Sequence, residues 1–213
     1  MKFIDMNDYK RKKHFDFFIK QDYPHMNLCA NVEITRLADF LKRNEFPFYF
    51  SLIYFSMRTA NQVKEFRHRI RKKKIIEHEV IHPSFSVMAE DDIFSFCTSK
   101  YFPNFHTFLQ NAQNEAEKVK AKPVIEDEPG RDDLVYITCI PWVSFTGISH
   151  PMHLHPVDSI PRIAWGKYFK DNGKLLLPFS VQVHHALMDG VHIGRFFKLF
   201  QELLDEPEKM LQV

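Results

Sequence analysis

The sequence predicts an α+β fold built on a mainly antiparallel or mixed β-sheet. Short segments in which apolar and polar residues alternate recur in its middle and in its last third. Apolar residues with helical spacing lie between them, and the tripeptide Asp171-Asn172-Gly173 is typical of a tight hairpin turn. The 213 residues contain no internal repeat and no linker-like break, so we expect a single domain over residues 1–213.

The residue pattern in the first fifth of the chain predicts one helix and one strand. Residues 8–19 fit a helix that carries basic and aromatic side chains. Residues 29–35 fit a strand, because Val32 and Ile34 alternate with polar neighbours.

Two further helices are expected next. Thr35 fits the N-cap of a short helix, with Asp39 as the acid of a capping box. A longer helix is expected over residues 47–67, because Pro47 suits a first helical turn and apolar residues continue along one face.

The rest of the chain alternates strands and helices. We expect strands or hairpins within 75–97, a surface helix over 104–120, a loop at 126–130, a buried strand over 134–141, hairpin arms over 163–169 and 174–183, and a closing amphipathic helix over 190–204.

Composition excludes several classes of protein. A net charge of +2 gives no electrostatic reason for a nucleic-acid partner. The N-terminus lacks the apolar region of a signal peptide, and the longest apolar run, residues 46–57, is too short to span a membrane. The three cysteines are far apart, which is typical of reduced thiols, so we expect a cytoplasmic protein. The 22 phenylalanines provide apolar area for a core, a pocket or a subunit interface.

The segment from Val181 to Gly190 is the most informative part of the sequence. An alternating strand ends at His184 and His185, and Asp189 and Gly190 follow before the last helix. Histidine is the side chain best suited to take a proton near neutral pH, and the carboxylate lies about one helical turn away. The spacing alone also fits a structural histidine pair followed by an aspartate that caps the helix.

Two other clusters allow a binding function. His150, His153 and His155 could bring two imidazoles to a metal ion, but solvated loop histidines explain them as well. The basic run at residues 67–74 could contact nucleic acid or attract an anionic cofactor. Its simpler interpretation is a solvated helix end, where the helix dipole favours cations.

Residues 182–192 resemble the signature of the chloramphenicol acetyltransferase family. Other segments resemble further motifs of this family, namely residues 11–18, 66–70, 82–87, 137–146 and 166–168. Because the resemblance spans nearly the whole chain, it implies the family's fold and activity. The fold would be a two-layer sandwich with a mixed sheet and helices packed on one side. The activity would be acetyl transfer from acetyl-CoA to a hydroxyl of chloramphenicol, in a homotrimer with active sites between subunits and without a metal.

The resemblance also assigns roles to individual residues. His185 would be the general base, with its ring held by its own backbone carbonyl, and Thr138 would donate to the oxyanion in place of the family's serine. Asp189 would brace the corner by pairing with Arg11 from the N-terminal helix.

Binding of the two substrates is assigned in the same way. Trp142, Lys167 and Tyr168 match positions near coenzyme A, where aromatic rings can stack on adenine and an ammonium can meet phosphate. Packing and solvation explain these three residues as well. Phe18 matches an aromatic of the acceptor pocket.

The chain departs from the family pattern at several positions. Ala164 replaces a threonine whose hydroxyl helps to place a water molecule, and Trp165 replaces a smaller methionine. Met188, Val191 and the segment 149–156 also differ. These changes bear on which acceptor is used more than on acyl transfer itself.

Three rival interpretations remain. Dihydrolipoyl acyltransferases carry a related histidine motif near the C-terminus, but usually with Asp-His-Arg where this chain has His184-His185-Ala186. Condensation domains share the motif but place it much earlier in a longer chain. A homologue that has lost activity and only binds ligands is favoured by Ala164 and opposed by the intact Arg11, Thr138, His185 and Asp189.

Overall fold

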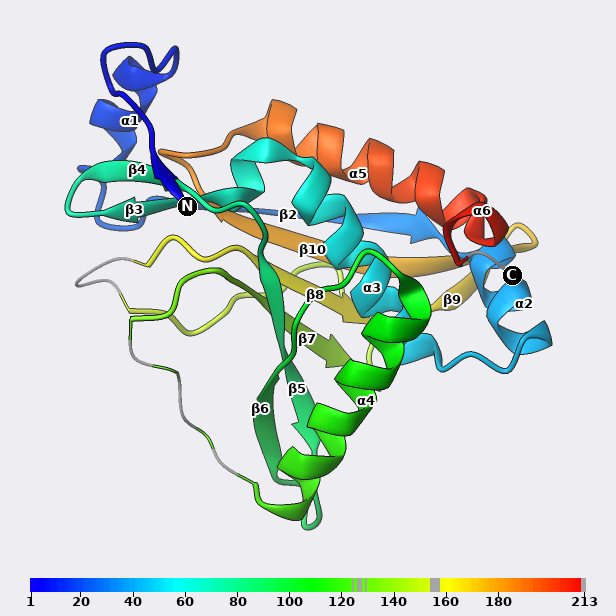
Figure 1. The fold of residues 1–213 in the computed structure, drawn as a ribbon. Helices are drawn as coiled ribbons and strands as arrows, with labels where there is room; N and C mark the ends of the chain where they lie inside the picture. The colour runs from blue at the N-terminus through cyan, green and yellow to red at the C-terminus, as the bar shows by residue number, and fades with distance from the viewer. Residues whose placement is uncertain (124, 126–127, 129, 154–157, 212–213) are drawn as a thin grey trace.

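A mixed sheet forms the centre of the computed structural model, which describes residues 1–123, 125, 128, 130–153 and 158–211 (Figure 1). Its strands follow one another in the order β2 (His25–Glu33), β10 (Lys174–His184), β8 (Arg162–Gly166), β7 (Leu134–Ile140), β5 (His82–Met88) and β6 (Phe94–Thr98). A short strand, β9 (Phe169–Asp171), also pairs with β10. β7 runs parallel to β5 and β8, and the other pairs are antiparallel.

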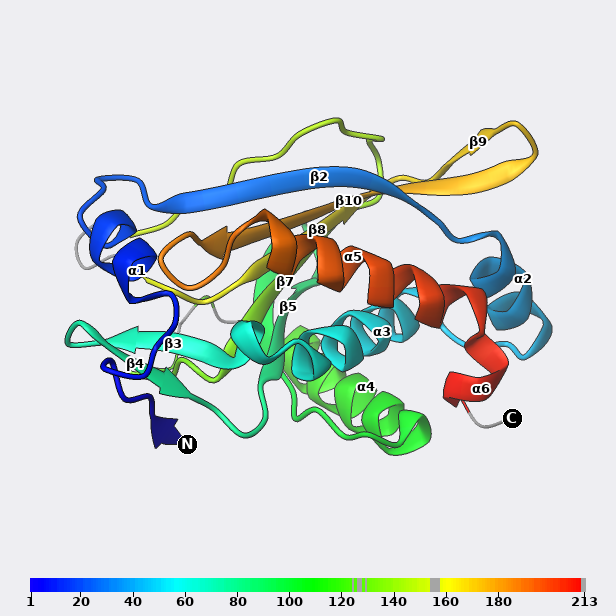
Figure 2. The same ribbon diagram turned by 90° about the horizontal axis from the view of Figure 1, so that it is seen from above.

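The helices of the second layer lie along one face of this sheet. They are α3 (Phe48–Gln62), α4 (Phe105–Ala121) and α5 (Gly190–Asp205), seen side by side in Figure 2. The buried residues Phe85, Ile137, Ile163 and Val181 are register partners across four strands and belong to one apolar core. The predicted two-layer α/β sandwich with a mixed sheet is therefore confirmed.

Smaller elements occupy the two ends of the sheet. Helix α1 (Lys12–Phe18) lies at one end, near a small sheet made of β1 (Lys2–Phe3), β4 (Lys74–Glu77) and β3 (His68–Arg71). Helices α2 (Thr35–Arg43) and α6 (Pro207–Leu211) lie at the other end. No helix in the described part of the chain is long and apolar enough to cross a membrane.

The predicted capping box at Thr35 is wrong. Ile34 occupies the N-cap of α2, and no side chain caps the helix. The Thr35 hydroxyl instead forms hydrogen bonds with two strands. It donates to Glu33 Oε1 at 3.2 Å and accepts from the Leu175 backbone N–H at 2.9 Å. The side chain therefore joins β2 to β10 rather than starting the helix.

The predicted long helix ends earlier than expected. Pro47 is the N-cap of α3, but Val63 adopts an extended conformation that stops the helix. A single 3-10 turn, η1 (Lys64–Arg67), follows.

The basic run at residues 67–74 is not a helix end, which corrects the simpler interpretation. It forms the end of η1, strand β3 and a tight turn in which Lys72 and Lys73 both have positive φ. Arg69 is fully buried, and its guanidinium donates to four backbone carbonyls, those of Phe66, His68, Asp132 and Leu134. Because these carbonyls accept its hydrogen bonds, the Arg69 guanidinium stabilises the fold. It is not accessible to a nucleic acid or an anionic cofactor.

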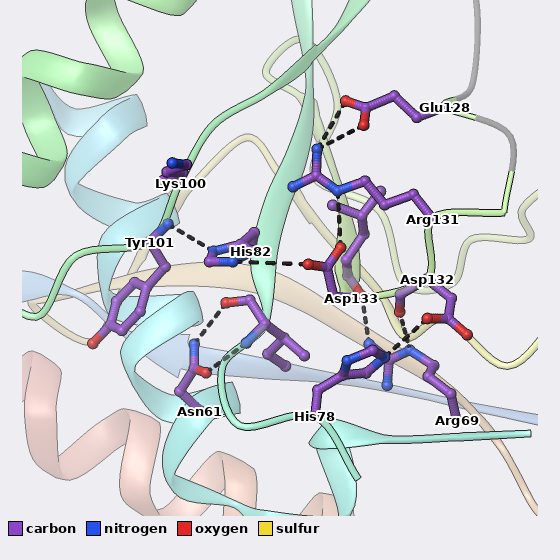
Figure 3. Close-up of polar contacts among 12 residues, drawn as sticks. Asn61, Arg69, His78, His82, Lys100, Tyr101, Glu128, Arg131, Asp132 and Asp133 are labelled. Carbon is purple, nitrogen blue, oxygen red and sulfur yellow. Dashed lines mark hydrogen bonds and ion pairs between the residues drawn. The ribbon is translucent and has the colours of Figure 1, made fainter. Parts of the chain in front are cut away.

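Asp132 joins the same hairpin to the segment before β7, and Figure 3 shows its contacts with Arg69 and His78. Its carboxylate accepts two hydrogen bonds from the Arg71 guanidinium, at 2.5 and 2.8 Å, and lies 2.9 Å from Nε2 of His78. Burial raises the pKa of Asp132, but the contacts with Arg71 and His78 outweigh this effect and hold the pKa well below its usual range. The hairpin is therefore tied to the segment that leads into β7.

The strand that carries the histidine pair starts at the predicted turn. Asn172 and Gly173 both have positive φ, as a two-residue hairpin turn requires. From this turn β10 runs between β2 and β8, and it pairs with β8 as far as Gln182 and with β2 as far as His184.

Candidate active site

The corner between β10 and α5 is a compact turn. The backbone N–H groups of Leu187 and Met188 both donate to the carbonyl of His184, at 3.0 and 3.1 Å. The His185 N–H donates to the Pro24 carbonyl at 2.7 Å, which ties the turn to the segment before β2. Ala186, Leu187 and Met188 are completely buried. The position of His185 is therefore set by backbone contacts on both sides.

The two adjacent histidines have different environments. His184 is only 1% exposed, and its Nδ1 accepts a hydrogen bond from the Ala186 N–H at 3.2 Å. Burial lowers the pKa of His184 to about 3, so the ring is neutral at physiological pH. Its ring contacts His25 edge to face, with 5.1 Å between centroids. His184 is thus part of the core.

His185 is the member of the pair that reaches solvent. Its ring stacks on Phe18, with centroids 3.7 Å apart and planes inclined by 8°. The Nδ1 atom is buried and has no hydrogen-bond partner within the described chain. The hydrogen bond to its own carbonyl that the resemblance implies is not formed, and that carbonyl faces Arg11 Nη2 at 3.5 Å. Phe18 fixes the plane of the ring, and Nε2 is the nitrogen left to meet a substrate.

An ion pair braces the corner from the other end of the sequence. Nη1 of Arg11, the N-cap residue of α1, contacts Oδ2 of Asp189. Oδ1 of Asp189 accepts from the Val191 N–H at 3.1 Å and so caps helix α5. Partial burial raises the pKa of Asp189, but Arg11 outweighs it and holds the pKa below its ordinary value. Asp189 therefore caps the helix, as the spacing allowed, and pairs with Arg11, as the resemblance implied.

Thr138 lies in another part of the fold. It is a β7 residue whose register partner on β8 is Ala164, and Ala164 in turn is paired with Ser180 of β10. By strand alternation this row faces away from the helices, because Ile137, Ile163 and Val181 line the helix-covered side. Within the described part of the chain, Thr138 and His185 do not form a hydrogen bond with each other.

The three residues matched to coenzyme A positions lie on two adjacent segments. Trp142 is 68% exposed, Tyr168 is 49% exposed, and Lys167 is exposed as well. The segments are joined because the Lys167 N–H donates to Val143 at 2.8 Å and Ser144 Oγ donates to the Lys167 carbonyl at 2.6 Å.

Gly166 allows this close approach. A Cβ atom there would lie 2.5 Å from the Val143 carbonyl oxygen, so any larger residue would push the two segments apart. The exposed aromatic rings and the ammonium form a set of groups suited to a nucleotide.

The histidine-rich segment gives no support to a metal site. His155 lies outside the described residues. Burial lowers the pKa of His150 to about 4, and the described chain contains no group of three or more His, Cys, Asp or Glu side chains placed to hold a metal ion.

Sequence reasoning missed two histidines near the corner. His25 packs on His184, and His192 contacts Asp189 at 2.9 Å from Nδ1 to Oδ1. His192 carries a recognisable signal, because it lies three residues after a helix N-cap, where capping-box side chains occur. His25 has no such signal, since β2 pairs with β10 only in the folded chain.

Comparisons with known proteins agree with one another. The family model described as chloramphenicol acetyltransferase matches residues 1–201. A chloramphenicol acetyltransferase of Clostridium perfringens is 36% identical, over 99% of both chains. A solved chloramphenicol acetyltransferase has a TM-score of 0.84 at 24% identity, covering 95% of this chain and 99% of its own. A dihydrolipoamide acetyltransferase of Azotobacter vinelandii shares the fold, with a TM-score of 0.68 at 16% identity over 93% of this chain and 88% of its own.

Proposed function

The chain belongs to the chloramphenicol acetyltransferase family, and we propose that it transfers acetyl from acetyl-CoA to a hydroxyl of chloramphenicol, with His185 as general base. It is an acyltransferase, as its relatives are. The observation that carries the proposal is the His185 ring, which is partly exposed, stacked on Phe18 and tied to the Arg11–Asp189 pair through its own carbonyl.

The proposed reaction is a direct attack within a ternary complex. Nε2 of His185 takes the proton of the acceptor hydroxyl while the hydroxyl oxygen attacks the thioester carbonyl carbon. The tetrahedral intermediate then collapses, the carbon–sulfur bond breaks, and the proton passes from His185 to the thiolate to give free coenzyme A and the acetyl ester. A hydroxyl is a weak nucleophile, so a positioned base is the main requirement of this chemistry.

Thr138 is proposed to donate its hydroxyl to the oxyanion of that intermediate. One such donor typically lowers the barrier by about 3 kcal/mol. Trp142, Lys167 and Tyr168 are proposed to bind coenzyme A. Their exposure on two joined segments supports this, because adenine needs a free aromatic face and phosphate needs an accessible cation.

A second candidate function concerns the acceptor. Ala164 is fully buried between Thr138 and Ser180 in the row of register partners. The hydroxyl that the family places at this position is therefore missing from the row that holds the proposed oxyanion donor. This observation favours another hydroxyl compound as the acceptor, or a homologue of low activity.

A thiol-release assay tests the function. We expect acetyl-CoA and chloramphenicol together to release free thiol, with no release when the acceptor is omitted. Release with other hydroxyl acceptors but not with chloramphenicol would keep the acyltransferase and change its substrate. Absence of release with every hydroxyl acceptor, together with absence of coenzyme A binding in calorimetry, would favour the inactive homologue.

We also propose that the chain acts as a homotrimer of single domains whose active sites lie between subunits. Two observations support this. Among the residues that the structure describes, His185 and Thr138 form no hydrogen bond with each other, and large apolar side chains such as Phe17, Phe94 and Phe96 are exposed. Exposed apolar surface of this kind is typical of an interface.

Subunit mixing tests the shared site. His185→Ala and Thr138→Ala chains are each expected to have low activity, but co-refolded mixtures should be far more active than the sum of the two. The reason is that a mixed trimer contains a site with His185 from one chain and Thr138 from its neighbour. Mixtures no more active than their parents, when sedimentation shows that mixed trimers have formed, would contradict the shared site.

The proposed setting is the cytoplasm, where acetyl-CoA is available and thiols stay reduced. Cys29, Cys97 and Cys139 are all free, which is compatible with that compartment. Acetylation of the antibiotic there would give resistance to chloramphenicol.

A further inference from the structure

His192 occupies a position between two carboxylates from different elements. Its ring is buried at the start of α5, with Nδ1 2.9 Å from Asp189 Oδ1 and Nε2 3.6 Å from Glu65 Oε1. Glu65 belongs to η1, the 3-10 turn that follows α3. The Asp189 N–H also points at His192 Nδ1, at 3.1 Å. The ring therefore connects the turn after α3 to the active-site corner.

We propose that His192 and Glu65 are positioning residues of this corner, which hold the Asp189 carboxylate in the orientation that serves Arg11. The inference rests on the proposed function of His185. The contacts form one chain: Glu65 faces His192, His192 holds Asp189, Asp189 binds Arg11, and Arg11 Nη2 faces the His185 carbonyl.

The orientation of the Asp189 carboxylate is what this chain of contacts fixes. An aspartate χ2 angle is otherwise broad, so the group can turn. Here Oδ2 accepts a hydrogen bond from Arg11, while Oδ1 faces both the Val191 N–H and the His192 ring. Without the ring, only the Val191 N–H would hold Oδ1, so the carboxylate would be less firmly oriented toward Arg11 and the His185 carbonyl would have a less firmly placed neighbour.

A helix cap alone does not require Glu65. Glutamate or glutamine at the position of His192 would complete the capping box through the Asp189 N–H, with one contact. The imidazole has a second nitrogen, and the structure directs it to a carboxylate on another element. The other ionisable groups that interact with these two carboxylates include Arg11, Tyr9 and His68. Burial raises the pKa of the Tyr9 hydroxyl above its ordinary value and lowers the pKa of His68 to about 4. Arg11 is thus the cation of a cluster in which Asp189 and Glu65 are the anions.

Two substitutions separate positioning from capping. His192→Gln keeps an acceptor for the Asp189 N–H but cannot reach Glu65 as well, and Glu65→Gln removes the charge that faces the ring. We expect each to lower kcat by about tenfold, while KM for acetyl-CoA and Tm stay close to the parent values. In an Arg11→Ala background the same changes should have little further effect, because the contacts they support are already lost. Glu202→Gln on the exposed side of α5 is the matched control and should change nothing.

A readout without substrate keeps this inference separate from the proposed function. The ¹⁵N chemical shifts of the His185 ring should change in His192→Gln and Glu65→Gln and stay unchanged in Glu202→Gln. Such changes in a protein that transfers no acetyl group would support the positioning role and refute the function. Unchanged His185 shifts and unchanged kcat, with or without a fall in Tm, would overturn the inference and reduce His192 to a cap.

Discussion

Replacing His185 with alanine is expected to lower kcat for acetyl transfer by about 100- to 10,000-fold, the usual contribution of a positioned general base. Neither the turn nor the brace should be lost, because the Pro24 contact and the Arg11 contact both involve the backbone of residue 185. KM for acetyl-CoA should change little for the same reason. Steady-state kinetics, with circular dichroism to check the fold, measure both effects.

The neighbouring histidine provides the control. His184→Asn keeps an acceptor for the Ala186 N–H but alters a buried ring that packs on His25. We expect it to lower Tm and to leave kcat, per folded chain, within a small factor of the parent. A His185→Ala chain of near-normal rate would show that another group is the base. The same kcat loss in both variants would mean that disorder of the corner, rather than loss of a base, slows the reaction.

The parts of the fold that could be predicted from the sequence are those governed by local patterns. The segment 134–141 indicated the buried strand β7, alternation indicated β10, and Asn172 and Gly173 indicated the hairpin turn because their positive φ is a local property. Arg69 could not be understood in this way. Its hydrogen bonds to Asp132 and Leu134 join residues more than 60 positions apart, so a charge that looks solvated in the sequence is buried in the fold.

The candidate site likewise contains features that a local sequence pattern indicates and features that depend on long-range contacts. The His-His-xxx-Asp-Gly pattern indicates a base and a nearby carboxylate, but the pairing of Asp189 with Arg11 spans 178 positions and came only from the family resemblance. The stacking of Phe18 on His185 depends on where α1 packs, which no local pattern specifies. The buried, unpaired Nδ1 of His185 differs from what the resemblance implies, because the orientation of a ring depends on its neighbours in space.

Acidification should destabilise the fold well before its carboxylates titrate. His68 and His184 are buried, and burial lowers their pKa values to about 4 and about 3. In the unfolded chain a histidine has a pKa of about 6.5. Between these values the unfolded state binds more protons, so stability is complete above about pH 6.5 and is lost as pH falls toward the folded-state values.

The size of this effect is large for a protein of marginal stability. Each such histidine costs up to about 1.4 kcal/mol per pH unit within the window, or about 3 kcal/mol per unit for the two together. Asp189 and Asp132 have lowered pKa values, so their contribution is retained until the pH falls below about 4, the ordinary value for a carboxyl. The loss between about pH 6 and pH 5 therefore reports buried histidines.

His68→Leu isolates one of these groups. Neither ring nitrogen of His68 has a hydrogen-bond partner in the described chain, so leucine removes a titrating group without breaking a hydrogen bond. Urea unfolding at fixed protein concentration, at about pH 7, 6 and 5, should show a pH slope smaller by about 1.4 kcal/mol per unit in this variant. His14→Leu on exposed helix α1 is the control and should keep the parent slope. Equal slopes for His68→Leu and the parent would mean that His68 is protonated as easily in the folded chain as in the unfolded one. Burial of a ring that is 3% exposed should not allow this.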